Sequence, residues 1–315
     1  MGSPSTLGAP TAWRMSGWTE AVTRYAARRL ASAVFVALGV TVATFLLLHV
    51  EPGDPARLVL GEHAPPSAVT ALRHEWGLDA SLPRQFVRFV SSLAHGDLGS
   101  SYINHVSSAT LIGQRVGLTA ALVGAATLFA VLITVPLATV AAARKDGLAD
   151  HFVRALSVTG LGMPVFWFGI VLIELFALRL HVVPVGGWGN GFGRHLQALV
   201  LPGLTASFAI VPILVRSLRV GMIEVLDADF VATARAKGIG ELRVLLAHVA
   251  RNALIPTVTL LGVNIAYLIG STVVVEQVFN LNGLGSLLLH SITDRDFPVV
   301  QSITLVLATS VVLNN

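Results

Sequence analysis

The sequence Asp227-Ala-Asp-Phe-Val-Ala-Thr-Ala-Arg-Ala-Lys-Gly238 is a polar stretch between two long apolar segments of the chain. It continues through Ile239-Gly240 into a helix-like run over residues 241–250 and ends at Pro256. Its first part combines small side chains, positive charge and a glycine that permits a turn, which together suit docking against a soluble partner. We refer to the whole stretch as the 227–256 loop. Its position predicts that the chain is one membrane part of a larger assembly.

The composition places the chain in the lipid bilayer. Hydrophobic residues make up 54% of its 315 residues and charged residues only 12%, against about 25% charged in ordinary soluble domains. A soluble protein of this length cannot hide so much apolar surface. The net charge is +4, but the basic residues are spread along the chain, so no nucleic-acid partner is indicated. Cysteine is absent, which excludes disulfides and cysteine-ligated metal sites.

Six apolar stretches are long enough, or nearly so, to cross roughly 30 Å of hydrocarbon. Each is expected to be a helix, because lipid offers no partners for unsatisfied backbone groups. The sequence therefore predicts an all-α membrane protein with six transmembrane helices, at residues 30–50, 118–143, 155–178, 199–215, 254–275 and 297–313. The sixth stretch stops about one turn short of a comfortable crossing, so we expect this end of the sequence to be truncated or divergent.

The first apolar stretch follows Arg28 and Arg29, as the core of a secretory signal peptide would. It is longer than the usual roughly 7–15 residues of such a core, and Glu51-Pro-Gly-Asp-Pro55 is a poor cleavage site. We therefore interpret residues 30–50 as a retained transmembrane helix. The segment before it, 1–29, begins with a stretch over residues 1–20 that is rich in Gly, Ser, Pro and Thr and is expected to be disordered.

The basic residues predict which side of the membrane each connection occupies. With a cytoplasmic N-terminus, thirteen Lys and Arg residues lie inside and eight outside, or thirteen against three without the long 51–116 segment. We expect a multi-pass protein of the bacterial inner or plasma membrane with both termini inside. Segment 51–116 is then external, and residues 117–315 form a five-helix core that includes the cytoplasmic 227–256 loop.

The 51–116 segment is long for a connection, which predicts that it carries structure or function. Residues 68–76 and 84–93 have the pattern of short amphipathic helices, with start signals at Pro65-Pro66 and Pro83.

Local structure is also expected around the 227–256 loop. The fourth span is expected to be kinked at Pro202 and Pro212 and to continue to about Leu226. After Gly240 the apolar residues recur at helical spacing, which predicts an amphipathic helix: Leu242, Leu245, Leu246 and Val249. The loop is thus predicted to be two short helices joined at a glycine.

An ordered series of motifs resembles one protein family. The sequence Phe230-Val-Ala-Thr-Ala-Arg-Ala-Lys-Gly238, with His248-Val-Ala-Arg-Asn-Ala-Leu-Ile-Pro256, resembles the coupling, or EAA, loop of ABC importer permeases. Its Thr-Ala-Arg-Ala-Lys-Gly core is typical of the dipeptide, oligopeptide and nickel branch. From about residue 24 to the end, further motifs resemble the first permease subunit of that branch: Pro52-Gly-Asp-Pro55, Leu60-Gly61, Gly77-Leu-Asp79, Pro83, Gln85-Phe86, Gly96-Asp-Leu-Gly-Ser-Ser101, Thr272-Val-Val-Val-Glu-Gln-Val-Phe279, Gly283-Leu-Gly285 and Asp296-Phe-Pro-Val-Val-Gln301.

The resemblance implies a type I ABC importer permease fold with cytoplasmic coupling helices. The chain would be the permease subunit of an ATP-driven importer for short peptides and would form half of the translocation pathway. Its implied partners are a second homologous permease subunit, two cytoplasmic ATPase subunits or domains, and an extracytoplasmic substrate-binding protein. The residues implied in coupling to the ATPase are Asp229, Ala232, Thr233, Ala234, Arg235, Ala236, Lys237 and Gly238.

The side chains of this motif suit the implied role. The alanines lack bulk and would let the loop approach a partner closely, and Arg235 and Lys237 would pair with acidic groups at the edge of a groove. The general motif begins with Glu where this chain has Ala232, and Asp229 is expected to supply a nearby acid. From the residues alone, a basic loop lying on anionic lipid explains the same charges, and the family motifs favour coupling.

The sequence contains no motif of an enzyme that acts on its own. A Gly-x-x-x-x-Gly-Lys-[Ser/Thr] phosphate loop is absent. The glycine-rich run 186–193 has no strand and helix around it, so we expect a turn there, and His74-Glu75 lacks the second histidine of a metalloprotease motif. We expect the chain to bind no cofactor itself, and ATP and Mg²⁺ to be used by the partner subunits.

Two polar residues inside the spans are candidates for the translocation pathway. Glu174 is an ionisable group in an apolar span, where such groups are costly and often functional, although a position near the outer interface beside Arg179 explains it equally. Asn264 is the second candidate, and a hydrogen bond across a helix interface is its alternative. His49 is interpreted as an interfacial residue, and the ten histidines show no metal-ligand spacing.

The cargo stays open at this stage. Short peptides are the leading class, and nickel, glutathione and haem-type cargo are the alternatives within the same family. A stand-alone secondary transporter would show an inverted repeat or paired broken helices, and neither is evident in the sequence. An intramembrane enzyme is disfavoured because no paired catalytic residues appear.

Overall fold

The computed structural model describes residues 16–50, 53–61, 63–189 and 191–314. Over these residues the chain is built from helices, and its only strand-like pairing there is an isolated bridge between Ser100 and Ser107. The prediction of an all-α protein is confirmed. Residues 1–15 of the stretch expected to be disordered lie outside the described residues. The rest of that stretch is helical, because the first helix begins at Ser16.

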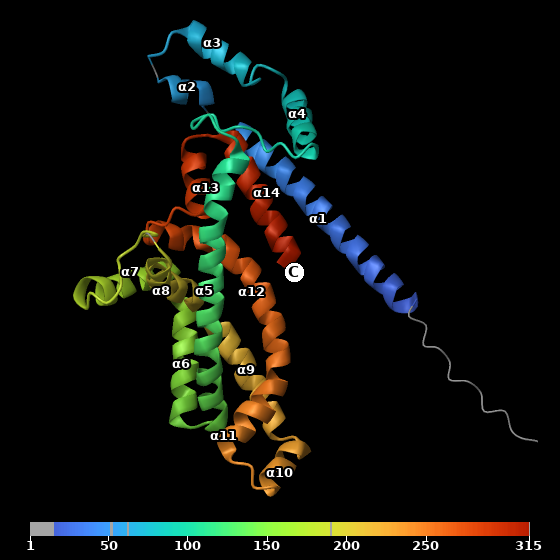
Figure 1. Cartoon of the computed structure of the whole chain (residues 1–315), viewed down its shortest axis with the longest axis vertical. Coiled ribbons are helices and arrows are strands. Elements are labelled where there is room, and N and C mark those ends of the chain that lie inside the picture. The colour runs from blue at the N-terminus through green and yellow to red at the C-terminus, as the bar shows by residue number, and fades with distance from the viewer. Residues whose placement is uncertain (1–15, 51–52, 62, 190, 315) are drawn as a thin grey trace, which may run out of the picture.

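The helices follow one another along an elongated molecule (Figure 1). The N-terminal group contains α1 (Ser16–Val50), α2 (Pro55–Leu60), α3 (Pro66–Glu75) and α4 (Leu82–Ala94). The central group contains α5 (Ser108–Ala143), α6 (Leu148–Gly162), α7 (Val165–Leu172), the π-helix η1 (Ile173–Arg179), α8 (Phe192–Phe208) and α9 (Val211–Leu226). The last group contains α10 (Asp229–Ala236), α11 (Glu241–Arg243), the π-helix η2 (Val244–Ala250), α12 (Arg251–Val278), α13 (Leu284–Thr293) and α14 (Phe297–Asn314).

One long helix, α5, connects the two ends of the molecule. In Figure 1, α5 runs from near α2 to α4 at one end towards the tip, α12 lies beside its lower part, and α10 and α11 form the opposite tip. The helix α5 packs against α8 and α9, α9 packs against α12, and α1 packs against α14. The 51–116 segment and the 227–256 loop therefore lie at opposite ends, as the predicted topology requires.

Small side chains bring α5 and α8 close together. On α5, Leu122, Ala126 and Ala130 are fully buried at a spacing of four residues, which places them on one face. A Cβ atom added to Gly203 of α8 would lie 3.0 Å from side-chain atoms of Ala125 and Phe129. Such small-residue contacts are typical of helices that pack inside a membrane.

The six predicted apolar stretches all lie in helices, but three differ from simple spans. Among the described residues, three helical stretches are long and apolar enough to cross a membrane: Ala27–Leu47, Ser108–Ala143 and Glu241–Val278. The predicted third and fourth spans are each two helices that meet at a bend, and counting each bent pair once gives up to five spans. The predicted sixth span is a shorter apolar helix, Phe297–Val312.

Proline lies at both bends. Between α6 and α7 the chain turns by 109°, and Pro164 directly precedes α7. Between α8 and α9 it turns by 61°, and Pro212 occupies the first turn of α9. Proline fits the first turn of a helix, because its missing N–H has no partner to lose there. The kink expected at Pro212 is thus a full break, whereas Pro202 lies inside α8 without ending it.

The two short helices expected in the 51–116 segment are present as α3 and α4, and each starts at the expected prolines. A third, α2, was missed. Its signal is Asp54 followed by Pro55: the Asp54 side chain accepts a hydrogen bond from the N–H of Ala56 at 3.0 Å, and the proline occupies the first turn.

The end of the 51–116 segment is held against the start of α14. The buried carboxylate of Asp296 accepts hydrogen bonds from the Ser101 hydroxyl and, at 3.0 Å, from the Tyr102 N–H. The Ser302 hydroxyl donates to the carbonyl of Leu98 at 2.7 Å. Two motifs that are about 200 residues apart in the sequence therefore form one contact.

A buried carboxylate joins α5, α12 and α13. Glu276 of α12 is fully buried, and its two oxygens accept hydrogen bonds from the Thr119 hydroxyl of α5 at 2.7 Å and from the Ser286 N–H at 2.8 Å. Thr119 in turn accepts the N–H of Leu284 at 2.8 Å. These bonds satisfy N–H groups in the first turn of α13, where a negative charge is also favourable.

The same carboxylate explains the motif Gly283-Leu-Gly285. A Cβ atom at Gly283 would collide with the Glu276 carboxyl group, and one at Gly285 would lie 2.5 Å from Cα of Val273. Both glycines are therefore required by close packing against α12.

We predict that Gly285→Ala lowers the free energy of unfolding by about 1–3 kcal/mol, because the new methyl group must displace the backbone of α12. Gly270→Ala on α12 is the matched control, since a Cβ atom there meets nothing within 4 Å, and it should stabilise the helix by up to about 1 kcal/mol. Thermal unfolding of the detergent-solubilised chain measures both. Equal unfolding midpoints for the two variants would contradict the packing argument.

Candidate functional site

The first helix of the 227–256 loop ends in a glycine turn at the tip of the molecule (Figure 1). After α10, the N–H of Gly238 donates to the carbonyl of Arg235 at 2.9 Å, and the N–H of Ile239 donates to that of Ala234 at 3.3 Å. This pair of bonds is a Schellman motif, which places its central residue in the left-handed region. Gly238 has φ of +74°, so the glycine turn predicted between the two helices is confirmed.

The second helix of the loop differs from the prediction. It is not a separate short helix, because α11, η2 and α12 form one continuous helical stretch of 38 residues, Glu241–Val278. Leu245 and Val249 are buried as expected, whereas Leu242 is 69% exposed and Leu246 is 46% exposed. The π-helical turn of η2 contains extra residues per turn, so the simple helical spacing used for the prediction does not hold there.

One face of α10 packs into the protein and the other is exposed. Val231 and Ala234 are buried in the same core cluster as residues of η2. Ala234 therefore does not belong to the exposed surface of the tip, and its role in coupling stays a prediction. The exposed coupling candidates are Asp229, Ala232, Thr233, Arg235, Ala236, Lys237 and Gly238.

Large apolar side chains accompany these small residues at the tip. Phe230 at the start of α10 is 45% exposed, and Leu242 of α11 is also exposed. Neither side chain was among the residues predicted to contact a partner. An exposed surface of alanines next to a phenylalanine and a leucine can bury apolar area against another protein.

Some charged side chains of the tip form ion pairs with described residues of the chain, and others do not. Arg235 donates two hydrogen bonds to the Glu241 carboxylate, at 2.5 Å and 3.0 Å, across the glycine turn. Both side chains are exposed, so water screens the pair and either member can exchange it for another partner. Lys237 makes no ion pair with the described residues. The exposed carboxylate of Asp229 lies in the first turn of α10, where it complements the helix dipole.

A buried ion pair holds the helices that lead to the tip. Asp150 in the first turn of α6 is fully buried, and it accepts bonds from Nε and Nη2 of Arg219 in α9, at 2.5 Å and 2.6 Å. The N–H of Asp146 adds a bond at 3.0 Å. The pair was not predicted, since 69 residues separate its members. No signal in the sequence singles out this pair, because both helices carry further charged side chains: Arg154 on α6, and Arg216 and Glu224 on α9.

The two pathway candidates lie in different places. Asn264 borders a cavity of about 360 Å³, together with residues of both helix breaks and Tyr267 of α12. Its Nδ2 donates to the carbonyl of Leu260 within its own helix, at 2.8 Å. Glu174 lies on η1, where its exposed side chain accepts a bond from Arg179 at 3.0 Å. Discontinuous helices that line a cavity are typical of transport pathways, and the pathway role of Asn264 and of Glu174 stays a prediction.

Metal-binding side chains do not gather in the described part of the chain. No group of three or more His, Asp or Glu residues comes together there. His49 bonds to the carbonyl of Phe45 at 2.7 Å and to Oε1 of Gln85 at 3.1 Å.

We predict that Gly238→Pro destabilises the tip by about 2–3 kcal/mol, because proline cannot adopt a positive φ and removes the N–H that donates to Arg235. Gly240→Pro is the matched control: its φ is already −60°, and its N–H makes no backbone bond in the turn. Proteolysis at Arg235 should become faster only in Gly238→Pro. Similar rates in both variants would show that the turn does not depend on Gly238.

We predict that Asp150→Asn costs about 3–5 kcal/mol of unfolding free energy, because it leaves the Arg219 charge buried without its partner. Asp146→Asn is the control, since its side chain is 68% exposed and its loss should change stability by less than about 0.5 kcal/mol. Chemical unfolding in detergent separates the two. A small, equal effect of both substitutions would mean that the buried pair does not hold α6 to α9.

Comparison with known proteins identifies the family. Residues 134–315 match the family "Binding-protein-dependent transport system inner membrane component", and residues 22–123 match its N-terminal counterpart, "Binding-prot-dependent transport system membrane comp, N-term". The chain is 36% identical over 291 residues to the glutathione transport system permease protein GsiC of Pectobacterium atrosepticum, which covers 92% of this chain and 94% of that protein. It is 35% identical over 294 residues, with the same coverage, to the probable peptide ABC transporter permease protein y4tP of Sinorhizobium fredii. These matches and the apolar helices show that the chain belongs to the family of binding-protein-dependent transport system inner membrane components, as a multi-pass ABC importer permease subunit and not an enzyme.

Proposed function

We propose that this permease subunit serves an ATP-driven importer of short peptides, with glutathione as the first alternative cargo. The support comes from relatives that match over nearly their whole length and are named for glutathione and peptide transport. Glutathione is itself a short peptide with free carboxylates, so both names point to one chemical class.

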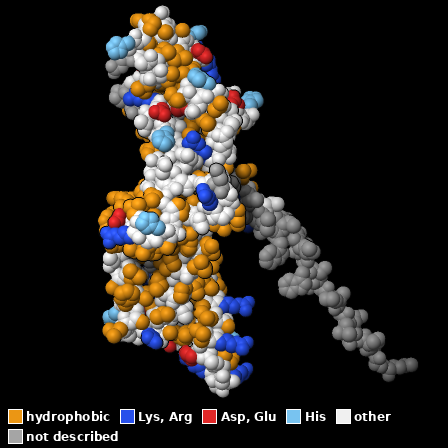
Figure 2. All heavy atoms as spheres, turned by 60° about the vertical axis from the view of Figure 1, so that its left-hand side comes forward, with side chains coloured by type: hydrophobic (Ala, Val, Ile, Leu, Met, Phe, Trp, Pro, Cys, Tyr) orange, Lys and Arg blue, Asp and Glu red, His pale blue; other side chains and the backbone are white. Residues whose placement is uncertain are grey.

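The 227–256 loop is the proposed contact with the ATPase subunits. The observation that carries this proposal is the exposed tip of small and apolar side chains, which includes Phe230, Ala232, Ala236 and Leu242. Figure 2 shows Lys and Arg side chains gathered at this lower tip, below a broad hydrophobic surface. Basic residues favour the cytoplasmic side of a membrane, which supports a cytoplasmic tip and a cytoplasmic N-terminus.

Four kinds of partner complete the proposed importer. Two cytoplasmic ATPase subunits or domains use ATP and Mg²⁺, and an extracytoplasmic binding protein delivers cargo to the end formed by α2 to α4. A second homologous permease supplies the other half of the pathway. Exposed apolar side chains on α1, such as Phe35 at 78% and Leu47 at 71%, suit contact with that subunit or with lipid.

The proposed mechanism is alternating access driven from the tip. Closure of the ATPase pair moves α10, and the short turn after α9 passes that movement to α9. Because Arg219 ties α9 to α6, both helices move together. Because the chain bends at Pro164 and Pro212, α7 and α8 can stay fixed while α6 and α9 move.

Uptake by the reconstituted complex tests this function. Proteoliposomes that contain this chain, its second permease and the ATPase subunits should accumulate labelled trialanine when ATP and the binding protein are present. Glutathione should compete if it shares the pathway. Gradient-driven uptake by this chain alone, without an ATPase subunit, would overturn the proposal.

We predict that Ala232→Trp lowers ATP-driven uptake about tenfold or more. The bulky ring should clash with the ATPase subunit, and a loss of only ~1.4 kcal/mol of binding free energy weakens that contact tenfold. The variant should still insert and unfold like the original chain, because Ala232 is exposed. Leu148→Trp adds an exposed aromatic side chain at the start of α6, where the residue is already 92% exposed. Uptake that survives Ala232→Trp, or is lost equally with Leu148→Trp, would contradict a specific contact at Ala232.

A further inference from the structure

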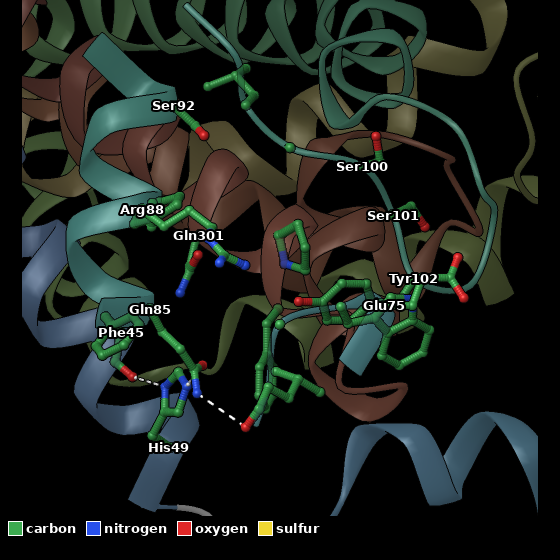
Figure 3. Close-up of a pocket in the computed structure, with 18 of the residues that line it drawn as sticks. Phe45, His49, Glu75, Gln85, Arg88, Ser92, Ser100, Ser101, Tyr102 and Gln301 are labelled. Carbon is green, nitrogen blue, oxygen red and sulfur yellow. Dashed lines mark hydrogen bonds between the residues drawn. The ribbon is translucent and has the colours of Figure 1, made fainter. Parts of the chain in front are cut away.

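A second cavity, of about 490 Å³, lies at the end of the molecule opposite the tip (Figure 3). It is bordered by the outer end of α1, by α4, by the connection after α4 and by the start of α14. It is open to solvent on one side, where Arg88 and Glu75 are exposed. Its size falls in the range of about 300–1,000 Å³ that is typical of small-molecule sites. No residue of the 227–256 loop and neither pathway candidate borders it.

The walls of this cavity are fixed by bonds within the protein. Gln85 uses its Nε2 to donate to the carbonyls of Leu78 and Ala80, at 3.2 Å and 2.8 Å, and its Oε1 faces His49. On the other side, the rings of Trp76 and Tyr102 stack with centroids 4.1 Å apart and planes within 8°. These contacts hold the cavity open without a ligand.

Two polar groups on one side of the cavity make no hydrogen bond or close ion pair with the described residues, although the pKa of the nearby Asp79 carboxyl group, which a hydrogen bond with His74 lowers, is lowered further by Arg88. Gln301 of α14 is only 7% exposed, yet its carboxamide makes no hydrogen bond with a described residue. Gln301 borders the cavity, and its amide is not one of the fully buried side-chain groups that lack a partner, so the amide keeps access to solvent and is available to a ligand. The Arg88 guanidinium of α4 forms no ion pair with the described carboxylates either. Figure 3 shows the Arg88 and Gln301 side chains lying next to each other at the cavity.

The backbone leaves room for the arginine. Gly77 has φ of +69°, and a Cβ atom there would collide with Nη1 of Arg88. The glycine of the motif Gly77-Leu-Asp79 therefore permits the guanidinium to lie at the cavity wall. An arginine beside an amide offers several N–H donors in fixed directions, which is the usual arrangement for binding a carboxylate.

The opposite side of the cavity has different chemistry. Glu75 and the stacked rings of Trp76 and Tyr102 lie there, across from Arg88 and Gln301 (Figure 3). Burial, together with the Asp296 carboxylate, raises the pKa of Tyr102 to about 12, so its phenol stays neutral. A carboxylate beside aromatic faces suits an ammonium group.

We propose that this cavity binds a small zwitterionic ligand of the peptide class, with its carboxylate on Arg88 and Gln301 and its ammonium group towards Glu75 and the Trp76–Tyr102 stack. A phosphate dianion fits less well, because it would meet one cation and face the Glu75 carboxylate. The choice of a peptide as the ligand rests on the proposed function. The positions of the positive and negative groups in the cavity are observed independently of that function. The cavity would hold cargo at the outer mouth before it enters the membrane.

Calorimetry on the full chain in lipid nanodiscs, without ATPase subunits, tests the proposal. Trialanine should bind, and Arg88→Ala or Gln301→Leu should weaken binding about tenfold or more, as expected for the loss of a hydrogen bond to a charged group. Arg84→Ala is the matched control, since Arg84 lies one turn earlier on α4 and does not border the cavity. It should leave binding unchanged.

Changes to the ligand test the same contacts without altering the protein. Trialanine amide should lose as much affinity for the original chain as trialanine loses for Arg88→Ala. N-acetyl-trialanine should bind more weakly than trialanine, and Glu75→Gln should not weaken it further. Inorganic phosphate should not displace trialanine.

The outcomes separate this proposal from the proposed function. If trialanine does not bind the nanodisc-embedded chain, or binds equally to Arg88→Ala, the cavity is not a peptide site, although ATP-driven uptake can still stand. If phosphate displaces trialanine, or the amide binds as well as the acid, the zwitterion assignment is wrong. If binding follows the pattern above but the complex shows no ATP-driven uptake, the proposed function fails and the site remains.

Discussion

A protein of this composition cannot leave a charge unpaired in its interior, and that constraint fixes the helices that carry the 227–256 loop. Asp150 is fully buried and meets Arg219 through two bonds. Taking both charges out of water is costly, so the arrangement persists only with good geometry and further hydrogen bonds, and the N–H of Asp146 supplies one of them. The consequence is mechanical: α6 cannot slide along α9 without breaking both bonds between Asp150 and Arg219.

The next constraint is that the two broken spans touch each other. A Cβ atom at Gly160, near the end of α6, would lie 3.2 Å from Pro212 and 3.4 Å from Phe208. The ring of Phe208 also stacks on Phe168 of α7, with centroids 4.0 Å apart. Both bends therefore meet at one place in the molecule, next to the cavity that Asn264 borders. Helix ends inside a membrane need such protein surroundings, because lipid would not satisfy their backbone groups.

The sequence was sufficient for properties that depend on local pattern. Apolar length predicted the helices, prolines predicted the starts of α3 and α4, and a glycine predicted the turn at Gly238. Properties that depend on contacts between distant segments were not predictable in this way. The burial of Ala234 is decided by η2, and the exposure of Leu242 and Leu246 follows from a π-helical turn that hydrophobic spacing does not reveal. The Asp150–Arg219 pair joins helices whose proximity no local pattern indicates.

The motifs that carry the family resemblance have mostly structural roles, and this explains why they identify the transporter class more readily than its cargo. Gly283 and Gly285 make room for Glu276 and α12, and Ser101 binds Asp296. Gln85 likewise uses its amide to hold neighbouring backbone in place. Any permease with this architecture needs such contacts whatever it carries. Polar groups that the fold leaves without hydrogen-bond partners are the ones free to meet a ligand. Gln301 is such a group, because it ends a family motif and yet bonds to no described residue.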